Sequence, residues 1–292
     1  MKRLSAAALT LLLGAALAAC GSEPAAGPSP SAGSAASPSP TAAQSSAPAP
    51  SPTAAETAVP APSAADGAPA AREPAKILYR MNKAYDIVPI DKTKASAQVV
   101  LLTFDDGPKD SKTLEPLLDA LDKHKAKAIF FVNGYRVKAH PELLKQIRER
   151  GQTIGNHSWD HIMLGKEKAD KIRKQIEDVQ AIVKDVAGVT PVFFRPPYAS
   201  GNADVHRIAE ENGLLYMTWS NGSLDWTLGA KDADKPQKVI DNVLKQLRPG
   251  SNILMHELPW TGEALDRLLT VLEQKGYGFV DPATIETKTA GS

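Results

Sequence analysis

Short apolar runs alternate with longer amphipathic stretches from about residue 76 to residue 282. The short runs suit buried strands, and the amphipathic stretches suit helices that pack on a sheet. This pattern predicts strands over residues 98–104, 128–132, 152–156, 192–195, 215–218, 252–255 and 277–280. It predicts helices over residues 112–124, 141–150, 166–185, 204–212, 236–247 and 263–274.

Strands that alternate with helices indicate an α/β fold with a parallel sheet. Two arrangements fit the pattern, a (β/α) barrel and an open doubly wound sheet. In both, ligands bind at the carboxyl ends of the strands. We find no internal repeat, so we expect one folded domain over residues 76–292.

The N-terminal quarter of the chain lacks this alternation. Residues 21–75 are almost entirely Ala, Pro, Ser, Gly and Thr, and they hold 12 of the 23 prolines and no aromatic residue. A segment of this composition cannot bury a core. We therefore expect a disordered linker that extends to residue 75.

The first residues of the chain resemble a lipoprotein signal. Two basic residues precede an uncharged run over residues 4–19, which is short for a membrane span but suits a signal peptide. Residues 17–21, Leu-Ala-Ala-Cys-Gly, are similar to a bacterial lipobox, and Cys20 is the only cysteine in the chain. The similarity implies a signal peptide over residues 1–19 and a lipid on Cys20, and the alternative is an ordinary secretory signal.

The charge balance excludes one class of partner. The chain has 34 basic and 33 acidic residues, for a net charge of +1. A nucleic-acid-binding protein normally has a strongly basic face, so we expect no nucleic-acid partner. We expect the protein to be a monomer.

Residues with catalytic chemistry gather where the predicted strands end. They are Asp105 and Asp106, His157 and His161, Arg195 to Tyr198, Asp225 with Trp226, and His256. Adjacent aspartates within a strand point to opposite faces. We expect Gly107 and Pro108 to end the strand, so that a turn brings both carboxylates to one site. Two carboxylates this close need a metal ion or an arginine nearby.

His157 and His161 are four residues apart. This spacing puts two imidazoles on one side of a helical turn, which is common for two ligands of one zinc ion, although such a pair also arises by chance. With one aspartate they form three protein ligands and leave a fourth position for water. This is the geometry of a catalytic zinc site.

Five motifs in order resemble those of the polysaccharide deacetylases, which form the NodB homology domain or carbohydrate esterase family 4. They are Thr103 to Gly107, His157 to His161, Arg195 to Tyr198, Asp225 with Trp226, and Leu254 to His256, within residues 98–280. The resemblance implies a distorted (β/α) barrel of about seven parallel strands with a single catalytic domain over residues 76–292.

The resemblance also implies which residues bind the metal and activate water. Asp106, His157 and His161 would bind the ion, usually Zn²⁺, with Co²⁺ or Ni²⁺ as alternatives. Asp105 would be the general base, and Arg195 would hold it ionised and oriented.

A second group of residues is implied to bind the acetyl group and protonate the leaving amine. His256 would be the general acid, paired with Asp225. The backbone N–H of Tyr198 would hold the oxyanion, and Tyr198, Trp226 and Leu254 would form the apolar walls around the methyl group.

Two features stay open at this point. Family members often have a further aspartate three residues before the Asp-Trp pair, where this chain has Gly222. We expect this change to affect substrate contacts or loop shape rather than catalysis. Trp159, Trp219 and Trp260 suit either sugar stacking or core packing.

The implied activity is hydrolysis of the amide C–N bond of N-acetylated amino sugars. The lipid anchor and the linker favour a cell-wall substrate, most of all the N-acetylglucosamine of peptidoglycan, and an extracytoplasmic, membrane-anchored location facing the wall. The alternatives are N-acetylmuramic acid, chitin oligomers, poly-N-acetylglucosamine, an acetyl ester, and a non-catalytic wall-binding lipoprotein.

Overall fold

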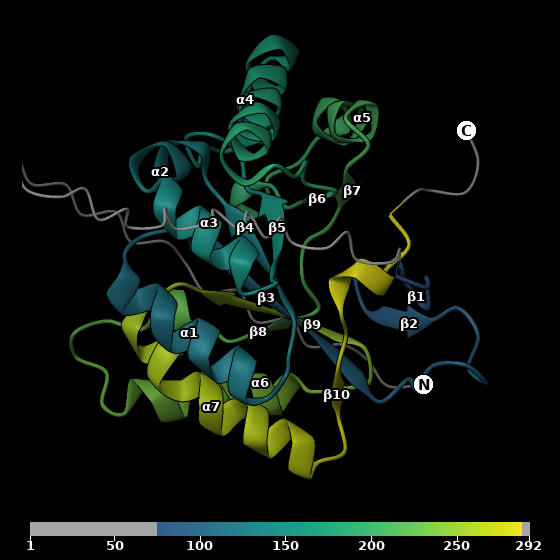
Figure 1. The fold of residues 1–292 in the computed structure, drawn as a ribbon, viewed down its shortest axis with the longest axis vertical. Coiled ribbons are helices and arrows are strands. Elements are labelled where there is room, and N and C mark those ends of the chain that lie inside the picture. The colour runs from purple at the N-terminus through teal and green to yellow at the C-terminus, as the bar shows by residue number, and fades with distance from the viewer. Residues whose placement is uncertain (1–74, 288–292) are drawn as a thin grey trace, which may run out of the picture. The chain divides into compact units, whose positions relative to one another are not determined.

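The computed structural model describes residues 75–287 (Figure 1). The predicted signal peptide, Cys20 and the linker up to residue 74 lie outside the described residues. The strands are β1 (Tyr79–Met81), β2 (Ile87–Pro89), β3 (Val99–Gly107), β4 (Ala128–Val132), β5 (Thr153–Asn156), β6 (Phe193–Phe194), β7 (Leu215–Tyr216), β8 (Asn221–Gly222), β9 (Ser251–His256) and β10 (Gly278–Phe279). The α-helices are α1 (Ser111–Lys123), α2 (Gly134–Ala139), α3 (Pro141–Glu149), α4 (Ala169–Ala187), α5 (Ala203–Glu211), α6 (Lys235–Gln246) and α7 (Pro259–Gln274).

The predicted α/β fold is confirmed. Each predicted strand and helix is present, with bounds that shift by a few residues. The sequence pattern missed the strands β1, β2 and β8 and the helix α2, all of which are short. Within residues 75–287, no helix combines the length and the apolar character that a membrane crossing requires.

The order of the strands decides between the two predicted arrangements. Seven parallel strands follow the order β7-β6-β5-β4-β3-β9-β8. Because β9 lies beside β3 and β8 lies outside β9, the strands follow the chain order around a ring that is open between β7 and β8. An open doubly wound sheet would place β8 nearer to β3 than β9. The sheet is therefore a distorted, incomplete (β/α) barrel, and β10 pairs in parallel with the beginning of β3.

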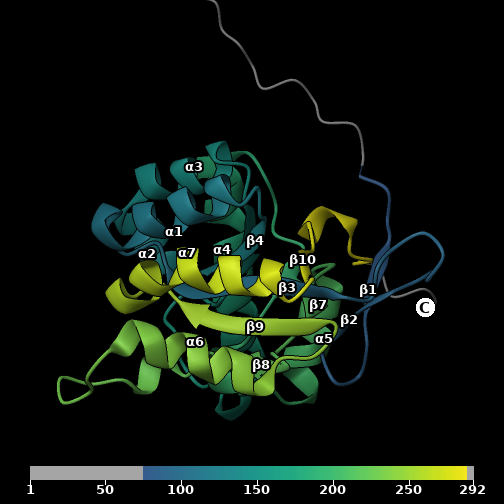
Figure 2. The same cartoon turned by 90° about the horizontal axis from the view of Figure 1, so that it is seen from below.

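Alternate residues of β3 separate the inside of the barrel from its helical layer. Leu101 belongs to an apolar cluster that includes Phe131 of β4 and Phe193 of β6. Leu102 and Phe104 belong to a second cluster formed with α1, α3, α6 and α7, which lie outside the sheet (Figure 2). Because side chains alternate along a strand, the face of Leu101 continues through residues 103 and 105. The barrel interior thus changes from apolar to polar at the carboxyl end of β3.

The antiparallel pair β1 and β2 lies at the other end of the barrel. Tyr79 and Ile87 are buried in the same interior cluster, and the backbone N–H of Ile87 donates to the carbonyl of Gly250 just before β9. Figure 2 shows this pair beside the beginning of β9. The amino-terminal end of the barrel is therefore covered, and the carboxyl end is the one that accepts a ligand.

Candidate active site

Asp106, His157 and His161 meet at the carboxyl end of the barrel. Their ligand atoms lie within 4.8 Å of one another. Asp106 Oδ1 is 3.5 Å from His157 Nε2 and 3.0 Å from His161 Nε2. One carboxylate oxygen and two imidazole nitrogens form a three-ligand set of the kind that binds a catalytic divalent metal.

The two aspartates converge by a different route from the one that the sequence predicts. β3 continues through Gly107, and the turn that we expected before Pro108 is not the cause. Instead, Asp106 adopts a left-handed conformation with φ 67°, and the pairing of β3 with β4 shifts register between Asp105 and Gly107. This bulge inserts one residue into the strand, so both carboxylates point to the same end of the barrel.

The helical explanation for the two histidines is also wrong. Residues 157–161 are not helical, and both Ser158 (φ 63°) and His161 (φ 55°) are left-handed. An irregular loop after β5 brings the imidazoles together. Left-handed residues other than glycine are uncommon, and they cluster at functional sites because the surrounding structure must hold them.

The protonation of these residues fits a cation. Burial lowers the pKa of His157, and its Nδ1 lies 2.6 Å from the carbonyl oxygen of Arg195, to which it donates. Nε2 therefore faces the site with its lone pair. Burial alone raises the pKa of Asp106, but the rings of His161, His157 and His256 outweigh it, so the pKa lies well below its usual range. Asp106 Oδ1 is buried and has no hydrogen-bond partner within residues 75–287.

Asp105 lies beside the triad and is held by a buried arginine. Arg195 Nη1 donates to Asp105 Oδ1 at 2.7 Å, and the other carboxylate oxygen is 3.7 Å from His157 Nε2. Asp105 is 3% exposed and Arg195 is fully buried. The pair leaves one oxygen of Asp105 turned toward the metal ligands, which is the position that a general base needs.

Arg195 is fixed from several sides. It donates to Thr103 Oγ1 at 2.8 Å, to the carbonyl of Thr218 at 2.8 Å and to Asn252 Oδ1 at 3.3 Å. Its guanidinium carbon lies 4.4 Å from the centre of the Phe131 ring. Because these contacts come from four different strands or strand ends, the barrel itself sets the orientation of Asp105.

His256 lines the same cavity from the end of β9 and contacts Asp225. Its Nδ1 is 2.8 Å from Asp225 Oδ1, and its backbone N–H donates to the other oxygen at 2.7 Å. Thr261 Oγ1 also donates to Asp225, which is fully buried. Because Asp225 accepts the proton on Nδ1, the free nitrogen of His256 is Nε2.

The pairing with Asp225 predicts a pH dependence of stability. Burial lowers the pKa of His256, but the hydrogen bond and the charge of Asp225 outweigh it, and the pKa lies above its ordinary value of 6.5. The folded state therefore binds this proton more tightly than the unfolded state does. The stabilisation is complete below about pH 6.5 and is lost as the pH rises through the folded-state pKa.

We expect the metal-free protein to have a higher free energy of unfolding than its His256→Gln variant, and we expect this difference to be largest at low pH. The difference should shrink as the pH rises above about 6.5. Urea unfolding of both proteins from roughly pH 5 to 9 measures it. A difference that stays constant, or that grows with pH, would contradict the pairing.

These residues surround a cavity of about 410 Å³. Its walls are formed by Asp105, Asp106, His157, His161, Pro196, Tyr198, Trp219, Trp226, Leu254 and His256. Tyr198 and Trp226 are 60% and 43% exposed, and Leu254 is buried. The cavity therefore combines apolar, aromatic walls with acidic and imidazole groups.

Tyr198 has a strained backbone beside the metal ligands. It is left-handed, with φ 58° and ψ 19°, and its ring is 4.7 Å from the ring of His161. The hydrogen bonds of this turn begin at Ala199 and Ser200, and no acceptor within residues 75–287 takes the N–H of Tyr198. This N–H is thus available to an oxygen in the cavity.

The structure places the residues that the sequence left open. A Cβ at Gly222 would lie 3.5 Å from Trp226 and 3.7 Å from Trp219, so this buried position lies next to two tryptophans that line the cavity. Trp219 lines the cavity, whereas Trp159 packs against Gly134 and the main core. Trp260 donates its indole N–H to the carbonyl of Asp225 and lines a second pocket.

Sequence reasoning missed several residues that support the site. Thr103 and Asn252 hold Arg195, and alternation along β3 and β9 places them on the same faces as Asp105 and His256. This alternation along the two strands would have predicted both Thr103 and Asn252. Thr261, which donates to Asp225, lies outside the strands, and no comparable pattern marks it.

Comparison with known proteins agrees with this geometry. Residues 92–217 match the sequence profile described as polysaccharide deacetylase. A Bacillus cereus protein named peptidoglycan-N-acetylglucosamine deacetylase is 36% identical over 194 residues, which cover 64% of this chain and 68% of that protein. The chain belongs to the polysaccharide deacetylase family.

A longer family member gives the same match. Peptidoglycan-N-acetylglucosamine deacetylase PgdA of Listeria monocytogenes is 36% identical over 225 residues, which are 73% of this chain and 46% of that protein. The chain thus spans about half the length of this deacetylase.

Among solved structures, a pseudoenzyme of carbohydrate esterase family 4 from Bacillus anthracis shares the fold. It is 26% identical with a TM-score of 0.61, and the match covers 73% of this chain and 70% of that protein. Family membership alone therefore does not establish activity. The observation that bears on activity is that Asp105, the three metal ligands and His256 line one cavity.

Proposed function

We propose that this polysaccharide deacetylase removes N-acetyl groups from the N-acetylglucosamine of peptidoglycan. The observation that carries the proposal is the arrangement of one cavity. A carboxylate held by Arg195 lies beside a three-ligand metal site, and a histidine held by Asp225 lines the same cavity. Amide hydrolysis needs a base for water on one side of the bond and an acid for the amine on the other.

A divalent ion held by Asp106, His157 and His161 would polarise water and the acetamide carbonyl. Asp105 would take the proton of the attacking water, with Arg195 holding the carboxylate in place. The N–H of Tyr198 would donate to the carbonyl oxygen as negative charge develops there. His256 would give a proton from Nε2 to the sugar nitrogen as the C–N bond breaks, so that acetate and an amine leave.

We propose zinc as the resident ion, with Co²⁺ and Ni²⁺ as alternatives. Two imidazoles and one carboxylate are the ligand types that zinc uses in catalytic sites. Metal analysis of protein purified without added metal, with activity restored by each ion in turn, would identify it.

The proposed substrate draws on the names of the two relatives, since both act on peptidoglycan N-acetylglucosamine by name. Acetate release from purified wall, chitin oligomers and poly-N-acetylglucosamine would test it, with the position of the free amine found by mass spectrometry. Free amines on muramic acid would assign N-acetylmuramic acid as the substrate, and acetate release only from chitin oligomers would assign chitin oligomers. No release from any acetylated sugar would favour a wall-binding role.

We also propose that a lipid on Cys20 tethers the protein outside the cytoplasmic membrane, facing the wall. The lipobox-like residues 17–21 and the Pro-rich linker support this location. A fatty-acid probe should label the protein in cells, and the label should disappear in Cys20→Ala. Label that persists in the variant would refute the anchor.

A further inference from the structure

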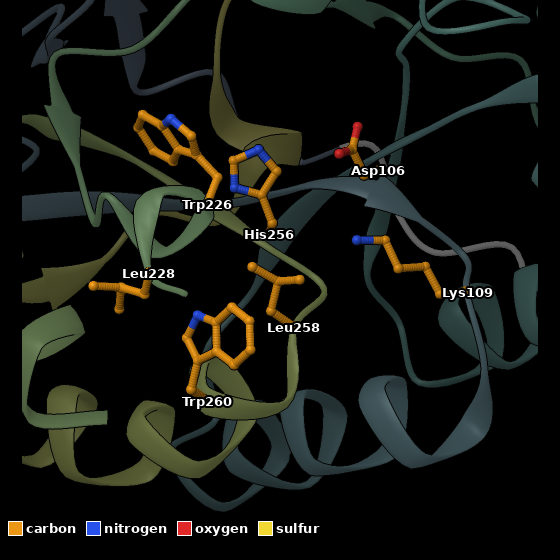
Figure 3. A pocket seen from close by; sticks show the side chains of 7 residues that line it. All are labelled: Asp106, Lys109, Trp226, Leu228, His256, Leu258 and Trp260. Carbon is orange, nitrogen blue, oxygen red and sulfur yellow. The ribbon is translucent and has the colours of Figure 1, made fainter. Parts of the chain in front are cut away.

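A second pocket of about 210 Å³ lies beside His256 (Figure 3). It shares Asp106, Trp226 and His256 with the catalytic cavity, so the two spaces adjoin. Its other walls are formed by Lys109, Leu228, Leu258 and Trp260. Because His256 would protonate the sugar nitrogen, this pocket lies where the polysaccharide continues beyond the reacting group.

Lys109 contributes an ammonium group that forms no ion pair within residues 75–287. Figure 3 shows its side chain directed from the loop after β3 into the pocket, opposite Trp226 and Trp260. The only hydrogen bond that Lys109 makes within residues 75–287 comes from its backbone N–H, which donates to Glu257 Oε1 at 2.8 Å. Its side chain forms no ion pair among these residues, and Asp106, the acid on the same wall, belongs to the metal ligands.

The backbone that carries Lys109 is held firmly. Glu257 is fully buried, and its Oε1 also accepts from the N–H of Asp110 at 3.3 Å and from Thr113 Oγ1 at 2.8 Å. Asp110 caps α1 by accepting from the N–H of Thr113. The ammonium is therefore presented from a fixed loop, which reduces the entropy lost when it binds a partner.

A second cation lies near Lys109. Burial lowers the pKa of Lys109, and the charge of Arg136 acts in the same direction, against the opposing charges of Asp106, Glu257 and Asp225. Arg136 Nε is buried and lacks a hydrogen-bond partner within residues 75–287. Neither cation forms an ion pair within residues 75–287, and Lys109 lines the pocket beside a site that would hold a divalent ion. An ammonium in this setting favours an anion in the pocket.

We propose that Lys109 binds a carboxylate of the substrate polysaccharide, carried next to the sugar that is deacetylated. The aromatic and aliphatic walls suit sugar faces, and the ammonium suits one carboxylate. This inference rests on the proposed function. In peptidoglycan the carboxylate has two sources, the lactyl group of a muramic acid without a stem peptide and the stem peptide itself.

The test uses acetate-release kinetics on tetrasaccharides that differ in the charge and the substituent of their lactyl groups. They are a peptidoglycan tetrasaccharide with free lactyl carboxylates, its methylamide, its stem-peptide form, and the neutral chitin tetrasaccharide. The variants are Lys109→Met, which removes the charge, and Lys109→Arg, which keeps it. Lys112→Met is the matched control, since Lys112 is exposed on α1.

We expect Lys109→Met to raise KM for a carboxylate-bearing substrate by about ten- to hundredfold, the usual contribution of a charged hydrogen bond. KM for the methylamide and the chitin tetrasaccharide, and kcat for all substrates, should stay unchanged. Lys109→Arg should keep KM for the carboxylate-bearing substrates close to its value in the parent protein, and Lys112→Met should leave KM unchanged. An effect on the lactyl form alone identifies the lactyl group, and an effect on the stem-peptide form alone identifies the peptide.

An equal change of KM on charged and neutral substrates, or no change on either, would overturn the proposal. Calorimetric binding of the same tetrasaccharides to the zinc-loaded protein does not depend on turnover. If the protein binds them but releases no acetate, the proposed function fails while the carboxylate preference can still be read. If binding shows no preference for the carboxylate forms, the inference fails while the deacetylase assignment stands.

Discussion

Replacing Asp105 with asparagine should lower kcat for acetate release by about 10²–10⁴-fold. Asparagine has nearly the same shape and can still accept from Arg195, but it cannot take a proton from water. The proposed base is therefore removed while the metal ligands and the cavity remain. The loss is measured as acetate released from peptidoglycan at saturating zinc.

Two controls keep this result specific. Zinc affinity, measured by calorimetry, should change little, because Asp106, His157 and His161 are intact. Asp110→Asn, in the loop that follows β3, should leave kcat unchanged, because asparagine also caps a helix. Asp105→Asn leaves the charge of Arg195 uncompensated, so acetate release is measured well below the unfolding temperature of this variant. Activity within a few-fold of the parent would show that Asp105 is not the base.

Replacing Arg195 with methionine should lower the free energy of unfolding by about 3–5 kcal/mol. The change removes a fully buried cation and leaves the Asp105 carboxylate buried without its partner. It also leaves the carbonyl of Thr218 and the hydroxyl of Thr103 without their donor. Urea unfolding, followed by circular dichroism, measures the difference.

A double-mutant cycle separates the ion pair from packing. Adding Asp105→Asn to Arg195→Met should recover part of the lost stability, because the uncompensated charge is gone. Arg207→Met serves as a surface control, since Arg207 forms exposed pairs with Asp204 and Glu211 and should cost less than about 1 kcal/mol. Additive losses for the two buried residues would refute their coupling.

The sequence predicted best where burial is complete. All five residues of β4 are apolar and buried, and its predicted bounds match the observed ones. β8 has only Asn221 and Gly222 and owes its pairing to β9, so no local pattern marks it. Helix α2 is six residues long and stops before Pro141, which is too short for a clear helical period.

The candidate site was predictable as a set of residues but not as a geometry. Strand ends and motif order brought together the aspartates, the histidines and Arg195. The left-handed backbone of Asp106 and His161 depends on the surrounding barrel, and an aspartate or a histidine in the sequence does not by itself predict it. The pocket of Lys109 and Trp260 joins residues that are far apart in sequence, so only the folded chain shows it.

The most direct test of the central claim is acetate release from purified peptidoglycan by the full chain, with zinc and then with a chelator. We expect release with zinc, loss of release with the chelator, and recovery when zinc is restored. Release that persists in metal-free protein would contradict the role of Asp106, His157 and His161. No release at any metal concentration would contradict the proposed reaction on peptidoglycan.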